Sequence, residues 1–289
     1  MLFQFTEEAA QAISRYIQRV QNSVTDTMCN QYGEKTSLEM FTSDVEQDIR
    51  FLAIRLSRAR NATVVKRRDV EKALRKLVVE LFRTRKMSTV YYKQFLGDMS
   101  ILQERVTSSE KPRILDVGCG WGKISRRFSK KLDKKADVVG IDLDVLSLEY
   151  GGFLNRDASF VRADMRHLPL KPLAFDVILS SKVLHEVESK DELDNGLREF
   201  ARTLRRDGSV YVFDPFARFR VVKLIQRILH KVYPKIHILH KVHPKIDRYF
   251  QEGEFEDHLK KEKFRIISKS RIVWPISFRV FCSYIAVNT

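Results

Sequence analysis

Apolar residues recur at helical spacing through the first hundred positions of the chain. Three strong runs and one weaker run place an apolar residue every three or four positions, and each run predicts an amphipathic helix. These runs cover residues 9–24, 38–59, 70–81 and 88–106. Thr6 followed by two glutamates is typical of a helix start, whereas Thr63-Val64-Val65 has the composition of a short strand. We expect residues 1–106 to form an all-α domain.

The pattern changes after residues 107–112, which read Thr-Ser-Ser-Glu-Lys-Pro and have the composition of a linker. Short apolar segments then alternate with helical stretches, and this alternation predicts an α/β domain built on a doubly wound, mostly parallel sheet. Predicted strands cover residues 113–117, 137–141, 159–163, 175–180, 210–213, 264–272 and 277–286. The sequence therefore predicts a second domain over residues 113–289.

Composition narrows the class of protein. The chain has 289 residues, of which 44% are hydrophobic and 31% charged, and these values exclude a disordered or fibrous protein. Cys29, Cys119 and Cys282 are too few for a disulfide scaffold and too far apart for a Cys-x-x-Cys metal site. No apolar stretch approaches the roughly 20 residues needed to span a bilayer, and the first residues show no secretory signal. We expect a cytoplasmic protein without a metal site.

Positive charge is concentrated in particular segments of the chain. The formal net charge is +16, and residues 217–249 contribute half of it through nine basic residues and one acid. Residues 228–237 and 238–247 of this segment form a tandem decapeptide, with eight of ten positions identical. A second basic region covers residues 60–86. Each region is either a surface for an anionic partner, nucleic acid or membrane, or a helix face exposed to solvent.

A glycine-rich turn follows the first predicted strand of the second domain. Residues 114–122 read Ile-Leu-Asp-Val-Gly-Cys-Gly-Trp-Gly, and a helical pattern over 124–132 comes next. Glycine is needed where the backbone adopts a positive φ or where a ligand lies against the main chain. The spacing Gly-x-Gly-x-Gly differs from the dinucleotide pattern Gly-x-Gly-x-x-Gly. The turn by itself is either a ligand cradle or a tight connection between strand and helix.

Polar residues mark the ends of the next three predicted strands. Asp142 ends the second strand, 24 residues after Gly118, Asp164 ends the third, and His185 follows the fourth. The carboxyl ends of parallel strands meet at one edge of the sheet, which is where open α/β sheets bind ligands. A carboxylate at the position of Asp142 is suited to accept both hydroxyl groups of a ribose.

Taken together, these motifs resemble the class I S-adenosylmethionine-dependent methyltransferases, especially the group called methyltransferase type 11. The resemblance covers about residues 111–289 and rests on LDVGCGWG, GIDLD, RADMRHLPL, FDVILSSKVLHEV and RTLRRDGSVYVFD in that order. It implies a Rossmann-like, seven-stranded doubly wound sheet that closes with an antiparallel pair, and S-adenosylmethionine as cofactor.

The resemblance also implies roles for individual residues. Gly118 and Gly120 would pack against the methionine part of the cofactor, and Asp116 would hold its amino group. Asp142 would bind the ribose, Asp164 and the Met165 backbone would read the adenine, and Ser180 with Ser181 would border the methyl group. The expected cofactor-binding residues are Asp116, Gly118, Cys119, Gly120, Asp142, Leu143, Asp164, Met165 and Ser180. Asp144 reads as a helix N-cap.

His185 is the candidate catalytic base, because histidine titrates near neutrality and this residue follows the fourth strand. Asp214, at the end of the fifth strand, is a second candidate. The alternative for His185 is a pocket-shaping role. The adenine and cytosine amino-methyltransferase motif (Asn/Asp)-Pro-Pro-Tyr is missing after the fourth strand, which reads Ser-Ser-Lys-Val, and no Pro-Cys nucleophile is present there. Both routes of base methylation are therefore disfavoured.

The N-terminal helices have a separate resemblance, to the archaeal-type histone fold over residues 36–80. It implies that these helices pair in a homodimer. DNA-wrapping members carry an arginine seven residues before the aspartate of the last helix, but Ala62 occupies that position and Arg60 lies two residues away. A helical cap over the cofactor site is the alternative.

Three functions remain open. The first is methyl transfer from S-adenosylmethionine to an unidentified small molecule by in-line displacement. The second is a methyltransferase recruited to DNA, chromatin or RNA by the histone-fold-like domain. The third is a non-catalytic dimeric binding module, which the intact LDVGCGWG and Asp142 disfavour.

Overall fold

The computed structural model describes residues 4–24, 35–106, 110–132, 136–217, 250–273 and 279–289. The chain divides into two compact units, Met1–Thr89 and Val90–Thr289. The basic segment 217–249, with its decapeptide repeat, lies outside the described residues from position 218 onward.

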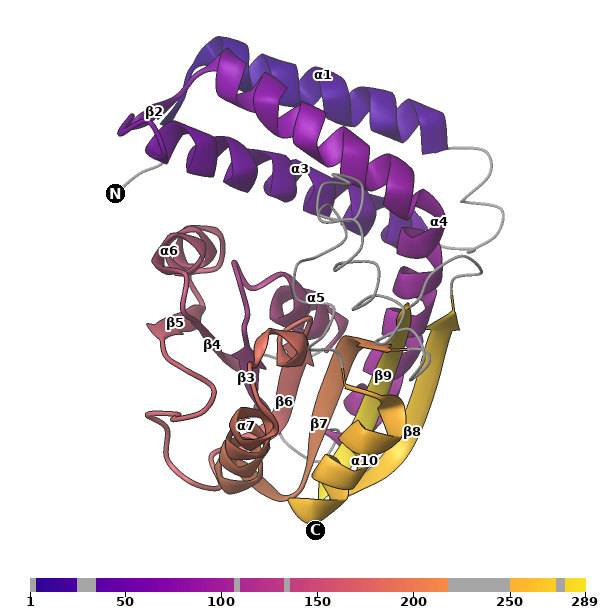
Figure 1. The fold of residues 1–289 in the computed structure, drawn as a ribbon. Coiled ribbons are helices and arrows are strands. Elements are labelled where there is room, and N and C mark those ends of the chain that lie inside the picture. Colours follow the sequence, from indigo (N-terminus) through magenta and orange to yellow (C-terminus); the bar gives the residue numbers. More distant parts are fainter. Residues whose placement is uncertain (1–3, 25–34, 107–109, 133–135, 218–249, 274–278) are drawn as a thin grey trace, which may run out of the picture. The chain divides into compact units, whose positions relative to one another are not determined.

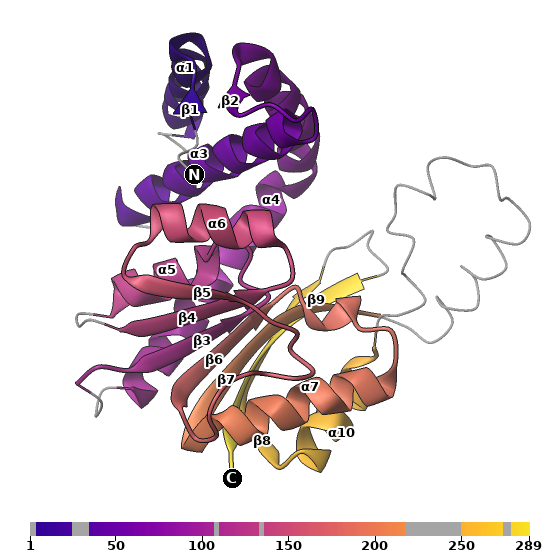
Figure 2. The same cartoon turned by 90° about the vertical axis from the view of Figure 1, so that its left-hand side faces the viewer.

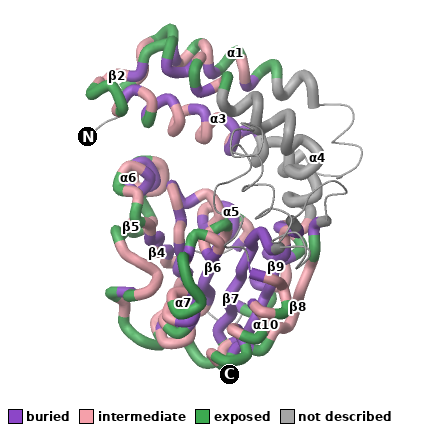
Figure 3. Tube along the Cα trace, in the orientation of Figure 1, coloured by how far each residue is buried: buried purple, intermediate pink, exposed green. Residues whose placement is uncertain are grey.

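The N-terminal unit consists of helices α1 (Glu7–Val24), α3 (Lys35–Arg58) and the first part of α4 (Arg67–Arg105), as Figure 1 shows. Thr6 caps α1, because its hydroxyl accepts a hydrogen bond from the Ala9 amide at 3.3 Å. Apolar residues at helical spacing are buried on all three helices (Figure 3). They include Ala9, Ile13, Ile17, Val45, Ile49, Ala53, Val70 and Ala73.

The N-terminal unit is not purely helical. Strand β2 (Val64–Val65) forms where the sequence predicted a short strand, and it pairs in parallel with β1 (Gln4–Phe5). Nothing in the four residues before α1 predicts β1, because a two-residue strand has no periodicity. The expectation of an all-α domain therefore omitted this two-stranded ladder.

Helix α4 is one continuous helix, whereas the sequence predicted two. The apolar spacing weakens between residues 82 and 89, but neither glycine nor proline is present there to end a helix. The two units divide within this helix, between Thr89 and Val90, and not at the linker expected at 107–112. Phe95, Met99 and Leu102 belong to the core beneath the sheet of the second unit.

The second unit contains a seven-stranded sheet in the order β5-β4-β3-β6-β7-β9-β8 within the described residues. The first five strands in this order are parallel, and β9 runs antiparallel to both of its neighbours. The strands are β3 (Arg113–Val117), β4 (Asp137–Asp142), β5 (Ala158–Arg162), β6 (Phe175–Ser181), β7 (Leu204–Ala217), β8 (Phe264–Val273) and β9 (Arg279–Asn288). The mostly parallel, doubly wound sheet predicted from the sequence is thus confirmed.

Helices cover both faces of this sheet (Figure 2). Helices α5 (Lys123–Lys131) and α6 (Val145–Leu154) lie on one face, and α7 (Lys190–Thr203) and α10 (Glu252–Lys261) lie on the other. The strand order reverses between β3 and β6, because β4 lies on one side of β3 and β6 on the other. Such a switch point leaves a crevice at the carboxyl ends of the strands.

Candidate functional site

The glycine turn between β3 and α5 uses three left-handed backbone conformations. Gly118, Gly120 and Gly122 have φ values of 61°, 54° and 78°. At Gly118 a Cβ atom would lie 2.2 Å from Cγ2 of Val183, whereas at Gly120 it would meet nothing within 4 Å. Gly118 is therefore required twice, by its backbone conformation and by the close approach of the segment after β6.

Asp142 ties this turn to the end of β4. Its Oδ2 atom accepts a hydrogen bond from the Gly120 amide at 2.8 Å, and its Oδ1 atom accepts one from the Asp144 amide at 2.9 Å. The Cys119 amide donates to the Ile141 carbonyl at 2.9 Å. Asp144 occupies the N-cap position of α6, and its carboxylate accepts from the Ser147 hydroxyl at 2.6 Å.

Asp116 lies buried at the base of the turn. One of its carboxylate oxygens accepts a hydrogen bond from the Ser125 amide at 3.2 Å. Burial raises the pKa of this carboxyl to about 6, hydrogen bonds from Ser125 act in the opposite direction, and the charge of Asp142 adds to the rise. A cationic group nearby would stabilise the ionised form of Asp116.

A cavity of about 480 Å³ opens at the carboxyl edge of the sheet. Its walls come from the ends of β3, β4 and β5, the segment after β6, and the start of α7. Five of the nine expected cofactor-binding residues line this cavity, namely Gly118, Asp142, Leu143, Asp164 and Met165. The other four, Asp116, Cys119, Gly120 and Ser180, lie outside its lining.

Cys119 and Ser180 are held within the protein interior. The Cys119 thiol donates to the Gly120 carbonyl at 3.3 Å, and its sulfur would lie 2.8 Å from a Cβ atom at Gly140. Burial raises the pKa of the Cys119 thiol, which keeps it protonated. Ser180 is fully buried on β6, and its hydroxyl has no hydrogen-bond partner among the described residues.

Asp164 is occupied by a neighbouring arginine. The Arg166 guanidinium contacts both of its carboxylate oxygens, at distances from 2.5 to 3.0 Å, and these hydrogen bonds lower the pKa of Asp164. The same guanidinium reaches Glu192 at the start of α7, with Nη1 2.5 Å from Oε1. Arg166 and Glu192 also line the cavity, and neither was predicted from the sequence.

The segment after β6 supplies further cavity residues that sequence reasoning missed. Lys182, Val183, Glu186, Val187 and Glu188 line the cavity. Lys182 has a φ of 61°, a conformation that costs energy for a residue with a side chain, at the point where the chain leaves β6. The only sequence signal for these residues was their position directly after a predicted strand.

Asp214 organises that segment from the neighbouring strand β7. Its buried carboxylate accepts hydrogen bonds from the amides of Val183 and Leu184 at 3.0 Å and from the amide of His185 at 3.2 Å. It also contacts Nδ1 of His185 at 2.6 Å. The other ring nitrogen of His185 lies 3.2 Å from Oε1 of Glu186.

These contacts place His185 behind the wall of the cavity and not in it. The contact with Asp214 at Nδ1 fixes the orientation of the His185 ring. His185 is not part of the cavity lining, but Glu186 is. The order Asp214, His185, Glu186 therefore connects a buried carboxylate on β7 to a carboxylate in the cavity wall.

No group of three or more histidine, cysteine, aspartate or glutamate side chains in the described part of the chain is arranged to hold a metal ion. Among the helices that the structure describes, none is long and apolar enough to cross a membrane.

Comparison with known proteins agrees with this geometry. Residues 114–208 match the family model described as "Methyltransferase domain". A ubiquinone/menaquinone biosynthesis C-methyltransferase, UbiE, of Idiomarina loihiensis is 30% identical over 108 residues, which are 35% of this chain and 42% of that protein. A malonyl-[acyl-carrier protein] O-methyltransferase of Legionella pneumophila is 36% identical over 100 residues, 33% of this chain and 34% of that protein. The chain thus spans less than half the length of these relatives.

Solved structures show the same fold. The geranyl diphosphate C-methyltransferase of Streptomyces coelicolor superimposes with a TM-score of 0.51 at 11% sequence identity, covering 67% of this chain and 76% of that one. The second unit therefore has the fold of this solved methyltransferase, and residues 114–208 within it are similar to the methyltransferase domain family. The glycine turn and both strand-end acids lie at the expected edge of the sheet.

Proposed function

We propose that the chain transfers a methyl group from S-adenosylmethionine to a small-molecule acceptor. The observation that carries the proposal is the 480 Å³ cavity at the switch point, with Gly118, Asp142 and Asp164 in its wall. The match of residues 114–208 to the methyltransferase family supports it, and the Streptomyces structure was solved with S-adenosyl-L-homocysteine. The cofactor, when bound, supplies a methyl group already activated on a sulfonium.

The described residues fit such a cofactor. The left-handed turn at Gly118 leaves backbone exposed to the cavity, and Asp142 presents a carboxylate for ribose hydroxyls while its backbone contacts hold it in place. Asp164 is the carboxylate assigned to the adenine amino group, and Arg166 contacts it in this structure. Asp116, just behind the cavity, is suited to interact with a cationic amino group through a water molecule.

If the acceptor atom carries a proton, methyl transfer requires a base to remove it. Glu186 faces the cavity, and His185 and Asp214 stand behind it in hydrogen-bonding order. We infer that Glu186 receives the proton and that His185 and Asp214 position it. The chain's other task is to align the acceptor with the methyl group.

The class of acceptor is inferred from the relatives. By their names, the three proteins above act in ubiquinone/menaquinone biosynthesis, on a malonyl group carried by the acyl-carrier protein, and on geranyl diphosphate. Incubation with S-adenosylmethionine labelled in its methyl group, and one acceptor of each class, would show which type is methylated.

Calorimetry with S-adenosylmethionine and S-adenosylhomocysteine tests the cofactor directly. The wild-type chain should bind both, and Asp142→Asn should weaken both by at least about tenfold through loss of the ribose contacts. Thermal unfolding of the variant shows whether the glycine turn remains stable, because Asp142 also accepts a hydrogen bond from the Gly120 amide. No binding heat with either compound would overturn the proposed function.

A second candidate, recruitment to nucleic acid, is favoured by one contact in the N-terminal unit. Arg60 lies two residues from the position that the arginine occupies in DNA-wrapping histones. Its guanidinium nevertheless pairs with Asp69, with Nη2 2.5 Å from Oδ1. Lys66, Arg67 and Arg68 are exposed beside it. We propose that this basic loop of a histone-fold-like, dimerising unit contacts DNA. Binding to duplex DNA should then weaken steeply with salt, and flat, weak binding would reject it.

A further inference from the structure

The carboxylate that is expected to read adenine is paired with an arginine in this structure. Asp164 Oδ1 accepts from the Arg166 backbone amide at 2.9 Å and from Nε at 2.9 Å. Asp164 Oδ2 accepts from Nε at 3.0 Å and from Nη2 at 2.5 Å. The single hydrogen on Nε is shared between the two oxygens, so three N–H groups of Arg166 take most of the roughly four acceptor positions of this carboxylate.

The opposite end of the Arg166 guanidinium is held by a fixed partner. Glu192 accepts Nη1 on one oxygen at 2.5 Å and the Glu188 amide on the other at 2.7 Å. The Glu192 amide in turn donates to the capping hydroxyl of Ser189 at 3.1 Å. Glu192 therefore stays in place when Arg166 moves, and it can keep the guanidinium after Asp164 is released.

Partial exposure makes the Asp164 pair exchangeable. The side chains of Arg166 and Asp164 are 35% and 28% exposed, and both line the same cavity as Asp142. An ion pair with this exposure is screened by water and weakly held. An incoming donor that is fixed by other contacts can replace it.

We propose that Arg166 competes with adenine for Asp164 and so sets the affinity of the cofactor site. Without cofactor, Arg166 joins Asp164 to Glu192. When an adenosyl group enters, its amino group donates to Asp164, and Arg166 keeps only its contact with Glu192. This inference rests on the proposed function, because it requires an adenosyl ligand in the cavity.

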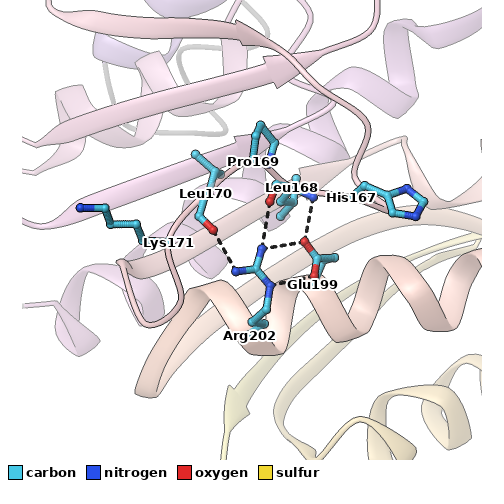
Figure 4. Close-up of a pocket in the computed structure, with 7 residues that line it drawn as sticks. All are labelled: His167, Leu168, Pro169, Leu170, Lys171, Glu199 and Arg202. Carbon is cyan, nitrogen blue, oxygen red and sulfur yellow. Dashed lines mark hydrogen bonds and ion pairs between the residues drawn. The ribbon is translucent and has the colours of Figure 1, made fainter.

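The segment that follows Arg166 is anchored independently, which allows Arg166 to be changed alone. Figure 4 shows this anchor: Arg202 on α7 donates to the carbonyls of Leu168 and Leu170 at 2.9 and 2.8 Å, and pairs with Glu199. Glu199 also accepts the Leu168 amide at 2.7 Å. Removal of the Arg166 side chain leaves all of these contacts in place.

The test is calorimetry of the full chain with S-adenosylhomocysteine. Arg166→Gln should bind about 2- to 5-fold more tightly than wild type, the range expected for loss of a partly exposed competitor. Glu192→Gln should bind several-fold more weakly, because the released guanidinium loses its charged partner. Arg162→Gln removes the same charge from an exposed position outside the cavity and should bind as wild type does.

A second measurement isolates the amino group. The gain in Arg166→Gln should appear with adenosine and disappear with purine riboside, which lacks the exocyclic amine, and it should also disappear in an Asp164→Asn background. Equal or weaker binding by Arg166→Gln would overturn the competition while leaving the proposed function intact. No binding by wild type or any variant would overturn both.

Discussion

The two sides of the cofactor cavity are built differently. On the β3–β4 side, Asp142 accepts hydrogen bonds from backbone amides of the glycine turn and of the start of α6. On the β5–β6 side, side chains from distant elements hold the cavity residues: Asp214 from β7 holds the segment after β6, and Glu192 from α7 holds Arg166. Backbone contacts leave few alternatives, whereas an exposed ion pair can exchange partners. The first side is therefore suited to fixed recognition. On the second side Asp214 also holds backbone amides, and only the Arg166 ion pairs are suited to adjustment.

The largest effect should come from Asp214→Ala, which removes the buried acceptor of the β5–β6 side. Three backbone amides and the His185 ring would lose their partner, and we expect a loss of about 3–5 kcal/mol in the free energy of unfolding. Urea denaturation measures it, and Asp157→Ala, at an exposed position, is the control. A loss below about 1 kcal/mol would show that this side does not depend on Asp214.

On the β3–β4 side, the matched pair Gly118→Ala and Gly120→Ala separates two costs. Both positions are left-handed, which costs about 1–2 kcal/mol for alanine, but only at Gly118 would the new methyl group meet Val183. We expect about 2–4 kcal/mol for Gly118→Ala and about 1–2 for Gly120→Ala.

Val183→Ala in the Gly118→Ala background should recover part of this difference, as measured by urea denaturation. If the two glycine variants lose the same free energy of unfolding, the close approach of Gly118 to Val183 does not add to the cost of the new methyl group.

Asp116→Asn should make stability less dependent on pH. Its pKa is raised from 3.8 to about 6 in the folded chain, so the carboxyl favours folding below pH 3.8 and loses that contribution as pH rises through 6. The variant lacks this loss and should be more stable than wild type by up to about 3 kcal/mol at pH 8, with the difference vanishing near pH 3. Thermal unfolding across this range, with Asp157→Asn as control, measures it. A stability difference between variant and wild type that does not change with pH would show that ionisation of Asp116 does not cause it.

The smallest effect on stability should be that of Arg166→Gln. Its ion pairs are partly exposed, and Arg202 and Glu199 anchor the following segment separately. We expect no measurable change in the midpoint of thermal unfolding, although cofactor affinity changes. A clear drop in the midpoint of thermal unfolding would show that the Arg166 ion pairs stabilise the fold. The β5–β6 side would then be as fixed as the β3–β4 side.

Prediction from the sequence was strongest where the signal is local. The glycine turn, the strand ends at Asp142 and Asp164, and six strands of the large sheet to within two residues at each end follow from short periodic segments. The fifth predicted strand, residues 210–213, was too short, because β7 covers Leu204–Ala217. Helix α4 was predicted as two helices, since weak apolar spacing resembles a break when the partner surface is unknown. Arg166, Glu186 and Glu192 were missed, because a charged residue near a strand end looks the same in the sequence whether or not it faces a cavity.

The sequence by itself determined the order of elements, the three left-handed glycines and the acids at the carboxyl edge, because backbone conformation and side-chain periodicity are properties of neighbouring residues. Only the tertiary structure decided which distant residues meet. Asp214 reaches His185 because β7 pairs with β6, Glu192 reaches Arg166 because α7 begins beside the end of β5, and the second part of α4 joins the core beneath the sheet. These contacts depend on how the layers pack, which no local pattern specifies.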